Sequence, residues 1–162
     1  MSVLRPASAN GFDALSSSSD DPGNENDQLA TLAIDGNPST AWNTQFYIGN
    51  PVFGGTKTGT GLILDMGRQV RLSSVRVTFG FIPGADVQIM LGNNNTRTPS
   101  ALDSFKTVAR GTGLAGTHTF TVTSRATGRY VLIWFTKLPP QSAGSSNRFE
   151  AKIYNVVVRG SR

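Results

Sequence analysis

The sequence has no cysteine, a single histidine and no long apolar run. Without thiols, the chain can form neither disulfides nor a thiolate metal site. A catalytic triad or a zinc site needs partners for His118, and the chain offers neither a cysteine nor a second histidine. No stretch approaches the roughly 20 apolar residues of a membrane helix. The first four residues lack the basic start and apolar run of a signal peptide, so we expect a cytoplasmic protein or a domain of a larger one.

Charged residues are also few, at 15% of the chain, whereas glycine occurs 18 times and Ser, Thr and Asn are abundant. This composition predicts an all-β chain with many turns. The length of 162 residues suits one domain. A globular chain of this size buries roughly 70% of its unfolded surface, so its core needs no covalent staple.

The charges are distributed unevenly along the chain. Residues 1–35 hold six acids against Arg5 alone, and residues 36–162 hold fourteen lysines and arginines against four acids. A basic body attracts anionic polymers such as nucleic acid, phospholipid or anionic cell-wall glycans. The alternative is that the charge serves solubility, because the basic residues are scattered rather than clustered.

Two parts of the chain differ in pattern. Residues 1–28 are polar and turn-rich without periodicity, which predicts an N-terminal arm lying over the domain. From residue 29 to residue 160, short apolar runs alternate with turn clusters, which is typical of a β-sandwich or barrel. The runs cover residues 29–34, 61–66, 72–79, 85–91, 104–109, 117–123, 130–136 and 153–158.

Within these runs, apolar side chains recur at every second position. Val75, Val77 and Phe79 share one face of their run, as His118 and Phe120 do in theirs. The run YVLIWF at residues 130–135 is apolar on both faces, which predicts a central strand that is covered on each side.

Two features that could suggest an enzyme have simpler interpretations. GTGLAG at residues 111–116 matches the dinucleotide fingerprint GxGxxG, but a strand pattern follows it where the fingerprint needs a helix. We therefore interpret it as a glycine-rich hairpin loop, and His118 as a half-buried strand residue. Glycoside hydrolysis needs paired carboxylates, and none of the acids outside the arm has a recognisable context: Asp35, Asp65, Asp86, Asp103 and Glu150.

The stretch LAIDGNPSTAWNT, residues 32–44, concentrates oxygen ligands at a turn. Asp35 brings a carboxylate, Thr40 brings a hydroxyl, and Gly36 and Pro38 turn the chain. Such a loop suits a hard cation such as Ca²⁺, or it is an Asx/Pro turn that satisfies its own backbone. Both interpretations stay open, and in either case Trp42 is expected to anchor the turn to the core.

The same stretch resembles the signature of galactose-binding-like domains. Ala33, Asp35, Gly36, Thr40 and Trp42 are in register with the pattern of discoidin, coagulation factor type C and related carbohydrate-binding modules. Later strands of that family resemble residues 61–67, 70–79, 128–135 and 151–160. The resemblance implies a jelly-roll β-sandwich over residues 29–160.

A closer resemblance is to one branch of this family. FD…GNEND, LAIDGNPSTAWNTQFYIGNP, GTGLILDMG and FTKLPP resemble the C-terminal extracytoplasmic domain of actinobacterial MviN-like proteins, of the lipid II flippase family. This implies an extracytoplasmic, cell-envelope domain of a larger membrane protein of peptidoglycan synthesis. The membrane is then reached only through the parent protein, and no nucleic-acid partner is expected.

The family resemblance also implies a structural Ca²⁺, while no cofactor is required. Carried over, the ligands are the carbonyls of Leu32, Asn37 and Tyr154 and the side chains of Asp35, Thr40 and Asn155. The family usually has Glu at the last position, so the neutral Asn155 predicts weaker Ca²⁺ binding, or a loop that stands without metal.

Long connections at residues 44–60, 92–100 and 137–148 are expected to gather at the ends of the sandwich, where function tends to lie. They supply the candidate ligand-binding residues Phe46, Tyr47, Phe53, Lys57, Arg97, Lys137 and Arg148. We expect a non-catalytic module that recognises a cell-wall glycan, a peptidoglycan precursor or related ligand, or an envelope protein. The alternatives are a structural protein–protein interaction domain with a vestigial ligand site, and a carbohydrate-active enzyme.

Overall fold

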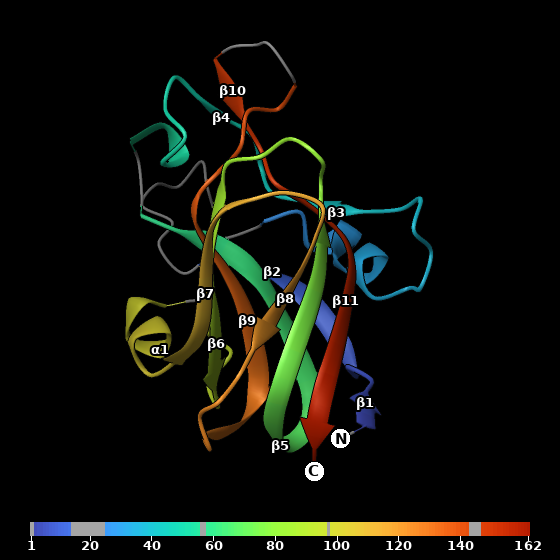
Figure 1. Ribbon diagram of the computed structural model, residues 1–162. Helices are drawn as coiled ribbons and strands as arrows, with labels where there is room; N and C mark the ends of the chain where they lie inside the picture. The colour runs from blue at the N-terminus through green and yellow to red at the C-terminus, as the bar shows by residue number, and fades with distance from the viewer. Residues whose placement is uncertain (1, 14–24, 56–57, 97, 143–146) are drawn as a thin grey trace.

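The computed structural model describes residues 2–13, 25–55, 58–96, 98–142 and 147–162 (Figure 1). Within these ranges the chain is mainly antiparallel strands, with a 3₁₀ helix η1 (Asp27–Ala33), a short 3₁₀ turn η2 (Phe53–Gly55) and one α-helical turn α1 (Pro99–Asp103). No helix in the described part has the length and apolar character to span a membrane. The predicted all-β sandwich is confirmed.

The strands form two layers that share one long strand, β5 (Thr60–Phe79). In the first layer, the first half of β5 pairs with β2 (Ser8–Phe12) and with β9 (Thr127–Lys137). β6 (Ala85–Gly92) pairs with β9, and β7 (Lys106–Leu114) pairs with β6. In the second layer, the second half of β5 pairs with β8 (Thr117–Thr121) and with β11 (Lys152–Ser161). β1 (Ser2–Leu4) pairs with β11. The remaining short strands are β3 (Trp42–Asn43), which pairs with β11, and the pair β4 (Tyr47–Ile48) and β10 (Arg148–Phe149).

Apolar side chains fill both faces of the first layer. The main core lies between the layers and includes Val75, Val77 and Phe120. A second cluster covers the outer face of the first layer beside α1: Phe12, Ile63, Met90, Phe105, Tyr130, Leu132 and Trp134. The strand over residues 130–135 is therefore buried on both faces, as predicted.

Two predicted runs adopt a different structure. Residues 29–33 of the run 29–34, predicted as a strand, belong to η1, and Ile34 caps it. The fully buried Ala30 and Ala33 are three residues apart and lie on one side of the 3₁₀ helix. The runs at 61–66 and 72–79 are one strand, β5, which turns between the layers and shifts register between Asp65 and Val70.

The predicted arm contributes two strands to the sheets rather than lying over them. β1 pairs with β11, and β2 pairs with β5 along Gly61–Asp65. The small residues of β2 give little apolar alternation in the sequence. A Cβ added to Gly11 would lie 2.3 Å from the carbonyl oxygen of Glu25, so only glycine lets the segment that contains Glu25 pack on β2. Residues 14–24 of the arm lie outside the described residues.

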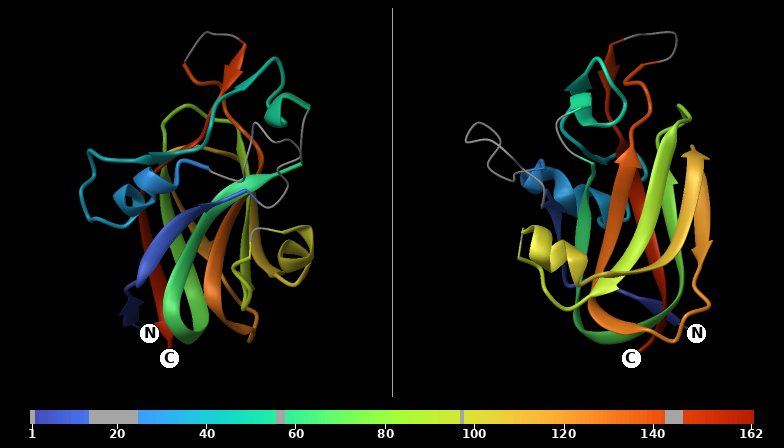
Figure 2. Two further views of the ribbon diagram at one scale, coloured as in Figure 1. Left: turned by 180° about the vertical axis from the view of Figure 1, so that it is seen from behind. Right: turned by 90° about the vertical axis from the view of Figure 1, so that its left-hand side faces the viewer.

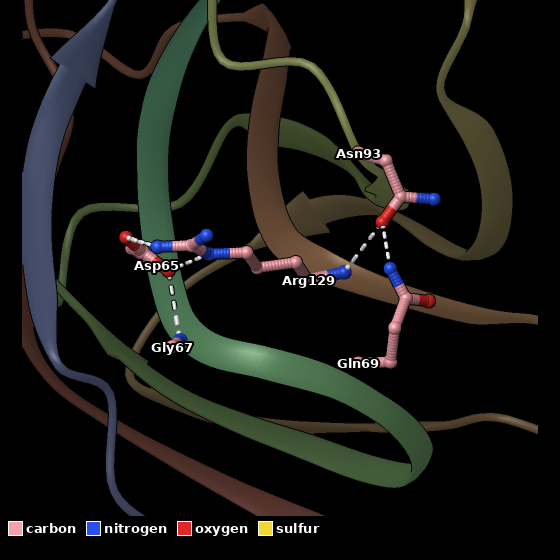
Figure 3. A network of polar contacts seen from close by, with 5 residues as sticks. All are labelled: Asp65, Gly67, Gln69, Asn93 and Arg129. Atoms are coloured by element: carbon pink, nitrogen blue, oxygen red, sulfur yellow. Dashed lines mark hydrogen bonds and ion pairs between the residues drawn. The ribbon is translucent and has the colours of Figure 1, made fainter.

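A polar network fixes the turn of β5 between the layers (Figure 3). The Asp65 carboxylate accepts hydrogen bonds from Arg129 Nε at 2.8 Å and Nη2 at 3.0 Å, and from the Gly67 amide at 2.7 Å. Gly67 has φ of 78°, which favours glycine. Asn93 Oδ1 accepts hydrogen bonds from the Arg129 amide and the Gln69 side chain. These bonds tie β5 to β9 where the chain reverses.

GTGLAG forms the end of β7 and the connection into β8, but the predicted hairpin is wrong, because β7 pairs with β6 and β8 pairs with β5 in the other layer. Gly113 and Gly116 have φ of 60° and 61°, and a strand follows instead of the helix of a nucleotide fingerprint. His118 is half-buried, with its ring centroid 4.6 Å from that of Phe120. The interpretation of His118 as a packed strand residue is confirmed.

Candidate functional site

The end of the sandwich opposite the termini carries most of the irregular structure. Figures 1 and 2 show both termini at one end and β4 and β10 at the other. We call the latter the loop end; it comprises the described residues of 43–59, 80–84 and 138–151. Exposed large apolar side chains occur here: Phe46, Ile48, Val52 and Phe81.

A pocket of ≈ 250 Å³ opens at the loop end. Its buried lining is apolar: Phe79, Ala85, Leu114, Pro139 and Ala151. The accessible lining is polar and aromatic and includes Phe81, Gln141, Glu150, Lys152 and Tyr154. An apolar floor with a few polar groups at its rim is the usual composition of a small-ligand site.

Phe81 is the most exposed large apolar side chain at the loop end, with 83% of its surface accessible. It lies in the turn Gly80–Gly84 that joins β5 to β6. Gly84 has φ of 131°, and hydrogen bonds from Gly116 N to Gly80 O and from Gly84 N to Leu114 O hold both ends of the turn. The turn therefore presents an aromatic face to solvent from a fixed base.

Phe81 was not among the predicted ligand-binding residues, because these were taken from the long connections and Phe81 lies in a short turn. The available signal was an aromatic residue inside the turn sequence GFIPG. Solvent-exposed phenylalanine in a tight turn has no packing role to explain it.

Glu150 is the one acidic residue among the described residues that line the pocket. Its side chain is half-buried, and this burial raises the pKa of the carboxyl, while the charge of Lys152 and the hydrogen bond from Gln141 lower it. Gln141 Nε2 donates to Glu150 Oε2 at 3.4 Å. The carboxylate, amide and ammonium groups offer both acceptors and donors to a hydroxyl-rich ligand.

Backbone hydrogen bonds hold these polar residues in place. Gln141 N donates to Arg148 O at 2.9 Å, and Glu150 N donates to Pro139 O at 3.1 Å. The fully buried Thr44 anchors the next residue, since its hydroxyl accepts from Ala151 N at 3.1 Å and its amide donates to Ala151 O at 3.0 Å. The pocket wall is thus tied to the segment after β3.

Four of the predicted ligand residues form a group beside β4 and β10. The guanidinium of Arg148 lies 5.0 Å from the ring centroid of Phe46, and Tyr47 packs edge-on against Phe53 at 5.2 Å. Phe46 is 47% exposed. Phe53 is fully buried, which contradicts its prediction as a ligand contact, because it supports the Tyr47 ring from inside.

The other predicted ligand residues are not brought into this group. Lys137 is exposed at the end of β9, opposite Asp86, and does not line the pocket. Lys57 and Arg97 lie outside the described residues.

The loop at residues 35–40 is closed by its own hydrogen bonds. Asp35 Oδ1 accepts from Asn37 N at 2.9 Å, and Asp35 Oδ2 accepts from the Thr40 hydroxyl at 2.6 Å. The pKa of Asp35 is lowered by the Thr40 bond first and by the Asn37 bond second. This geometry has the features of an Asx turn, and the fully buried Trp42 follows it, as predicted.

Three of the residues predicted to hold calcium, Asp35, Asn37 and Thr40, lie together in this loop. The Thr40 hydroxyl lies 2.6 Å from Asp35 Oδ2 and 3.2 Å from the Asn37 carbonyl oxygen. Tyr154 lies at a register shift of β11 between Ile153 and Asn155, which leaves it out of the ladder with β5. Asp35, Asn37 and Thr40 thus bring together a single carboxylate that is already hydrogen-bonded within the turn, and no group of three His, Cys, Asp or Glu able to hold a metal occurs among the described residues.

Comparison with known proteins adds evidence on the fold. No family model matches the sequence. Among solved structures, the carbohydrate-binding module (CBM32) of AlyQ, in complex with 4,5-unsaturated mannuronic acid, aligns with a TM-score of 0.63 at 18% identity over 98% of each chain. The family 32 carbohydrate-binding module of Clostridium perfringens NanJ, in complex with galactose, aligns with a TM-score of 0.59 at 21% identity over 96% of each chain.

A third similar structure is chitosan-binding module 1 from a chitosanase/glucanase of Paenibacillus sp. IK-5. It aligns with a TM-score of 0.60 at 16% identity over 97% of each chain. The chain therefore has the jelly-roll β-sandwich architecture of these carbohydrate-binding modules, and the sequence-based prediction of an all-β sandwich is confirmed.

Proposed function

We propose that this protein is a non-catalytic glycan-binding module whose ligand enters the pocket at the loop end. The observation that carries the proposal is the placement of the exposed Phe81 beside the polar side chains of Gln141, Glu150 and Lys152. An aromatic face packs on the apolar face of a sugar ring, and the polar groups bind ring hydroxyls. The pocket volume suits one or two sugar units.

The similar structures support this ligand class. They include complexes with 4,5-unsaturated mannuronic acid and with galactose, and a module that binds chitosan. These ligands differ in charge, so the shared fold supports carbohydrate in general and selects no particular sugar.

The pocket favours binding over the two alternatives. Glu150 is the one acid among the described residues that line it, whereas hydrolysis by the common glycosidase mechanisms needs two carboxylates. A purely structural interaction domain would favour a flat, filled loop end, and this one is hollowed.

Binding of monosaccharides and oligosaccharides to the whole chain, measured by calorimetry, tests the proposal. Phe81→Ala should abolish saturable binding while leaving the melting temperature unchanged, because the side chain is exposed. Phe46→Ala is the matched control: it removes a second exposed aromatic ring that does not line the pocket. Loss of binding in Phe46→Ala with retention in Phe81→Ala would move the site to the group around β4 and β10.

We further propose that the glycan belongs to the cell wall and that the module acts outside the membrane as part of an MviN-like protein. The support is the resemblance of FD…GNEND, LAIDGNPSTAWNTQFYIGNP, GTGLILDMG and FTKLPP to such proteins, together with the basic body of the chain. Purified muropeptides and peptidoglycan precursors should then bind more tightly than galactose. Equal or weaker binding would leave a glycan-binding module without this cell-wall role.

A further inference from the structure

The outer face of the second layer carries positive charge without negative charge. The strands involved are β8, the second half of β5, and β11, with β1 at the edge (Figure 1). No Asp or Glu occurs in residues 2–4, 67–79, 117–121 or 152–161. We call the outward positions the arginine face: Arg71, Ser74, Arg76, Thr78, Thr117, Thr119, Thr121, Val157, Arg159 and Ser161.

Strand register shows that these side chains share one face. Arg76 pairs with Thr119 on one side and with Val157 on the other. Directly paired residues of antiparallel strands point to the same side of the sheet. The neighbours of Arg76 along β5, Val75 and Val77, are fully buried in the core between the layers, so Arg76 points outward.

The arginines follow a regular track. Arg159 lies two residues beyond Val157, so the Cα atoms of Arg76 and Arg159 are about 8 Å apart. Arg71 pairs with Ser161, which places it about 8 Å from Arg159 in turn. All three side chains are exposed, and the strands that carry them contribute no carboxylate to this face.

The lower end of this track opens into a shallow hollow of ≈ 400 Å³. Its polar lining combines two guanidinium groups with hydroxyl and amide groups, from Gln69, Arg71, Thr127, Ser161 and Arg162. Arg71 lies between Thr127 of β9 and Ser161 of β11 in the ladder. The hollow extends the cationic track beyond β5.

We propose that the arginine face binds a linear polysaccharide that bears carboxylates. Arginine pairs bidentately with carboxylate, and the Ser and Thr side chains between the arginines can bind sugar hydroxyls. The outward positions hold no aromatic side chain, which disfavours single-stranded nucleic acid, since such binding uses stacking platforms. The neighbouring exposed apolar residue is Val3, too little for insertion into a lipid surface. This face is separate from the loop-end pocket and does not depend on it.

The test measures binding of the whole chain to immobilised polygalacturonate, with dextran as the neutral polymer. Arg76→Gln/Arg159→Gln should weaken binding about tenfold, as expected for two exposed charge pairs. Lys106→Gln/Arg110→Gln is the matched control, because it removes two exposed charges on β7, away from the face; less than a twofold change is expected. All four side chains are exposed, so the variants should keep the parent melting temperature.

Several outcomes would overturn the proposal. Equal loss in the control variant would show that net charge alone attracts the polymer. Tighter binding to polyphosphate or to phosphatidylglycerol vesicles than to polygalacturonate would assign the face to phosphate groups. Phe81→Ala should leave polygalacturonate binding intact, so failure of the pocket and failure of the arginine face are distinguishable.

Discussion

At the scale of single residues, the partial burial of Glu150 affects both its pKa and its proposed role in ligand binding. Its half-buried position raises the pKa of the carboxyl above the ordinary value, and it borders the same pocket as the exposed Phe81. A carboxylate that is partly desolvated accepts hydrogen bonds more strongly than one in water. The residue is therefore both a ligand contact in the proposed site and a group whose ionisation can be followed.

Glycan affinity should fall as the pH drops through the pKa of Glu150, because the ionised form accepts hydrogen bonds from ligand hydroxyls. Since that pKa is raised, the fall should begin at a higher pH than for an ordinary glutamate. Glu150→Gln should weaken binding at neutral pH by about tenfold, the value of one hydrogen bond to a charged group, and should remove this pH dependence. Calorimetric titrations from neutral to acid pH measure both effects; an unchanged pH profile in the variant would exclude the role of Glu150.

Trp42 anchors the loop at residues 35–40 to the core of the protein. It is fully buried, its indole N–H donates to the Glu25 carbonyl oxygen at 2.8 Å, and its ring lies 6.3 Å from that of Phe135. Trp42→Ala should lower the free energy of unfolding by about 3–5 kcal/mol, as for other large buried aromatics. Trp42→Phe keeps the ring and loses the hydrogen bond, so its loss should be smaller. Urea unfolding compares the variants, and a loss below about 1 kcal/mol in Trp42→Ala would contradict the anchoring role.

At the scale of elements, β5 is the strand on which the fold depends, since it belongs to both layers. Its reversal rests on the positive φ of Gly67 and on the bidentate pair between Asp65 and Arg129 (Figure 3). Arg129 lowers the pKa of Asp65, mainly through this hydrogen bond. A depressed folded-state pKa means that the pair stabilises the fold above the unfolded-state pKa and that this stabilisation is lost as the pH falls through the folded-state pKa.

Asp65→Asn should lower the free energy of unfolding at neutral pH by about 0.5–1 kcal/mol, a small value because the pair is partly exposed. The difference from the parent should shrink as the solution is acidified below about pH 4, where the parent loses the same charge. Asp103→Asn is the control, since Asp103 is exposed on α1. Denaturant unfolding at several pH values measures the difference, and a gap that persists at low pH would mean that the pair does not act through charge.

Elements were predictable from sequence where their pattern was local. The alternation of Val75, Val77 and Phe79 with polar residues predicted the second half of β5 and its buried face. The run 29–34 was misassigned because a short, mostly apolar run does not distinguish a strand from a helix by periodicity. The strands in residues 2–12 were missed because their inward positions include Ala9 and Gly11, which carry little apolar signal.

At the scale of the whole molecule, the pocket was not predictable because it is assembled from distant segments. Phe81 comes from the turn between β5 and β6, while Gln141 and Glu150 come from the connection between β9 and β11. Within this connection, Gln141 N donates to Arg148 O and Glu150 N donates to Pro139 O. Sequence placed Phe46, Tyr47 and Arg148 at the same end, and these do meet around β4 and β10. The types of residue in the long connections predicted which end of the sandwich carries the candidate site. The position of the pocket at that end depends on how the strands pair, which the sequence does not show.

The two proposed binding surfaces differ in character as well as in position. The pocket at the loop end is concave, mainly apolar at its floor and suited to one or two sugar units. The arginine face is open, cationic and suited to an extended chain. The two surfaces therefore suit different ligands and can be tested independently.

The most direct test of the central claim is to map glycan binding by NMR, titrating the isotope-labelled chain with a muropeptide and, separately, with galactose. The account predicts saturable backbone shift changes at Gly80–Ile82, Gln141 and Glu150–Lys152, with the strands of the arginine face unaffected by a short neutral sugar. Saturable changes confined to other surfaces, or none with any glycan tested, would contradict the assignment of the loop-end pocket as a glycan site.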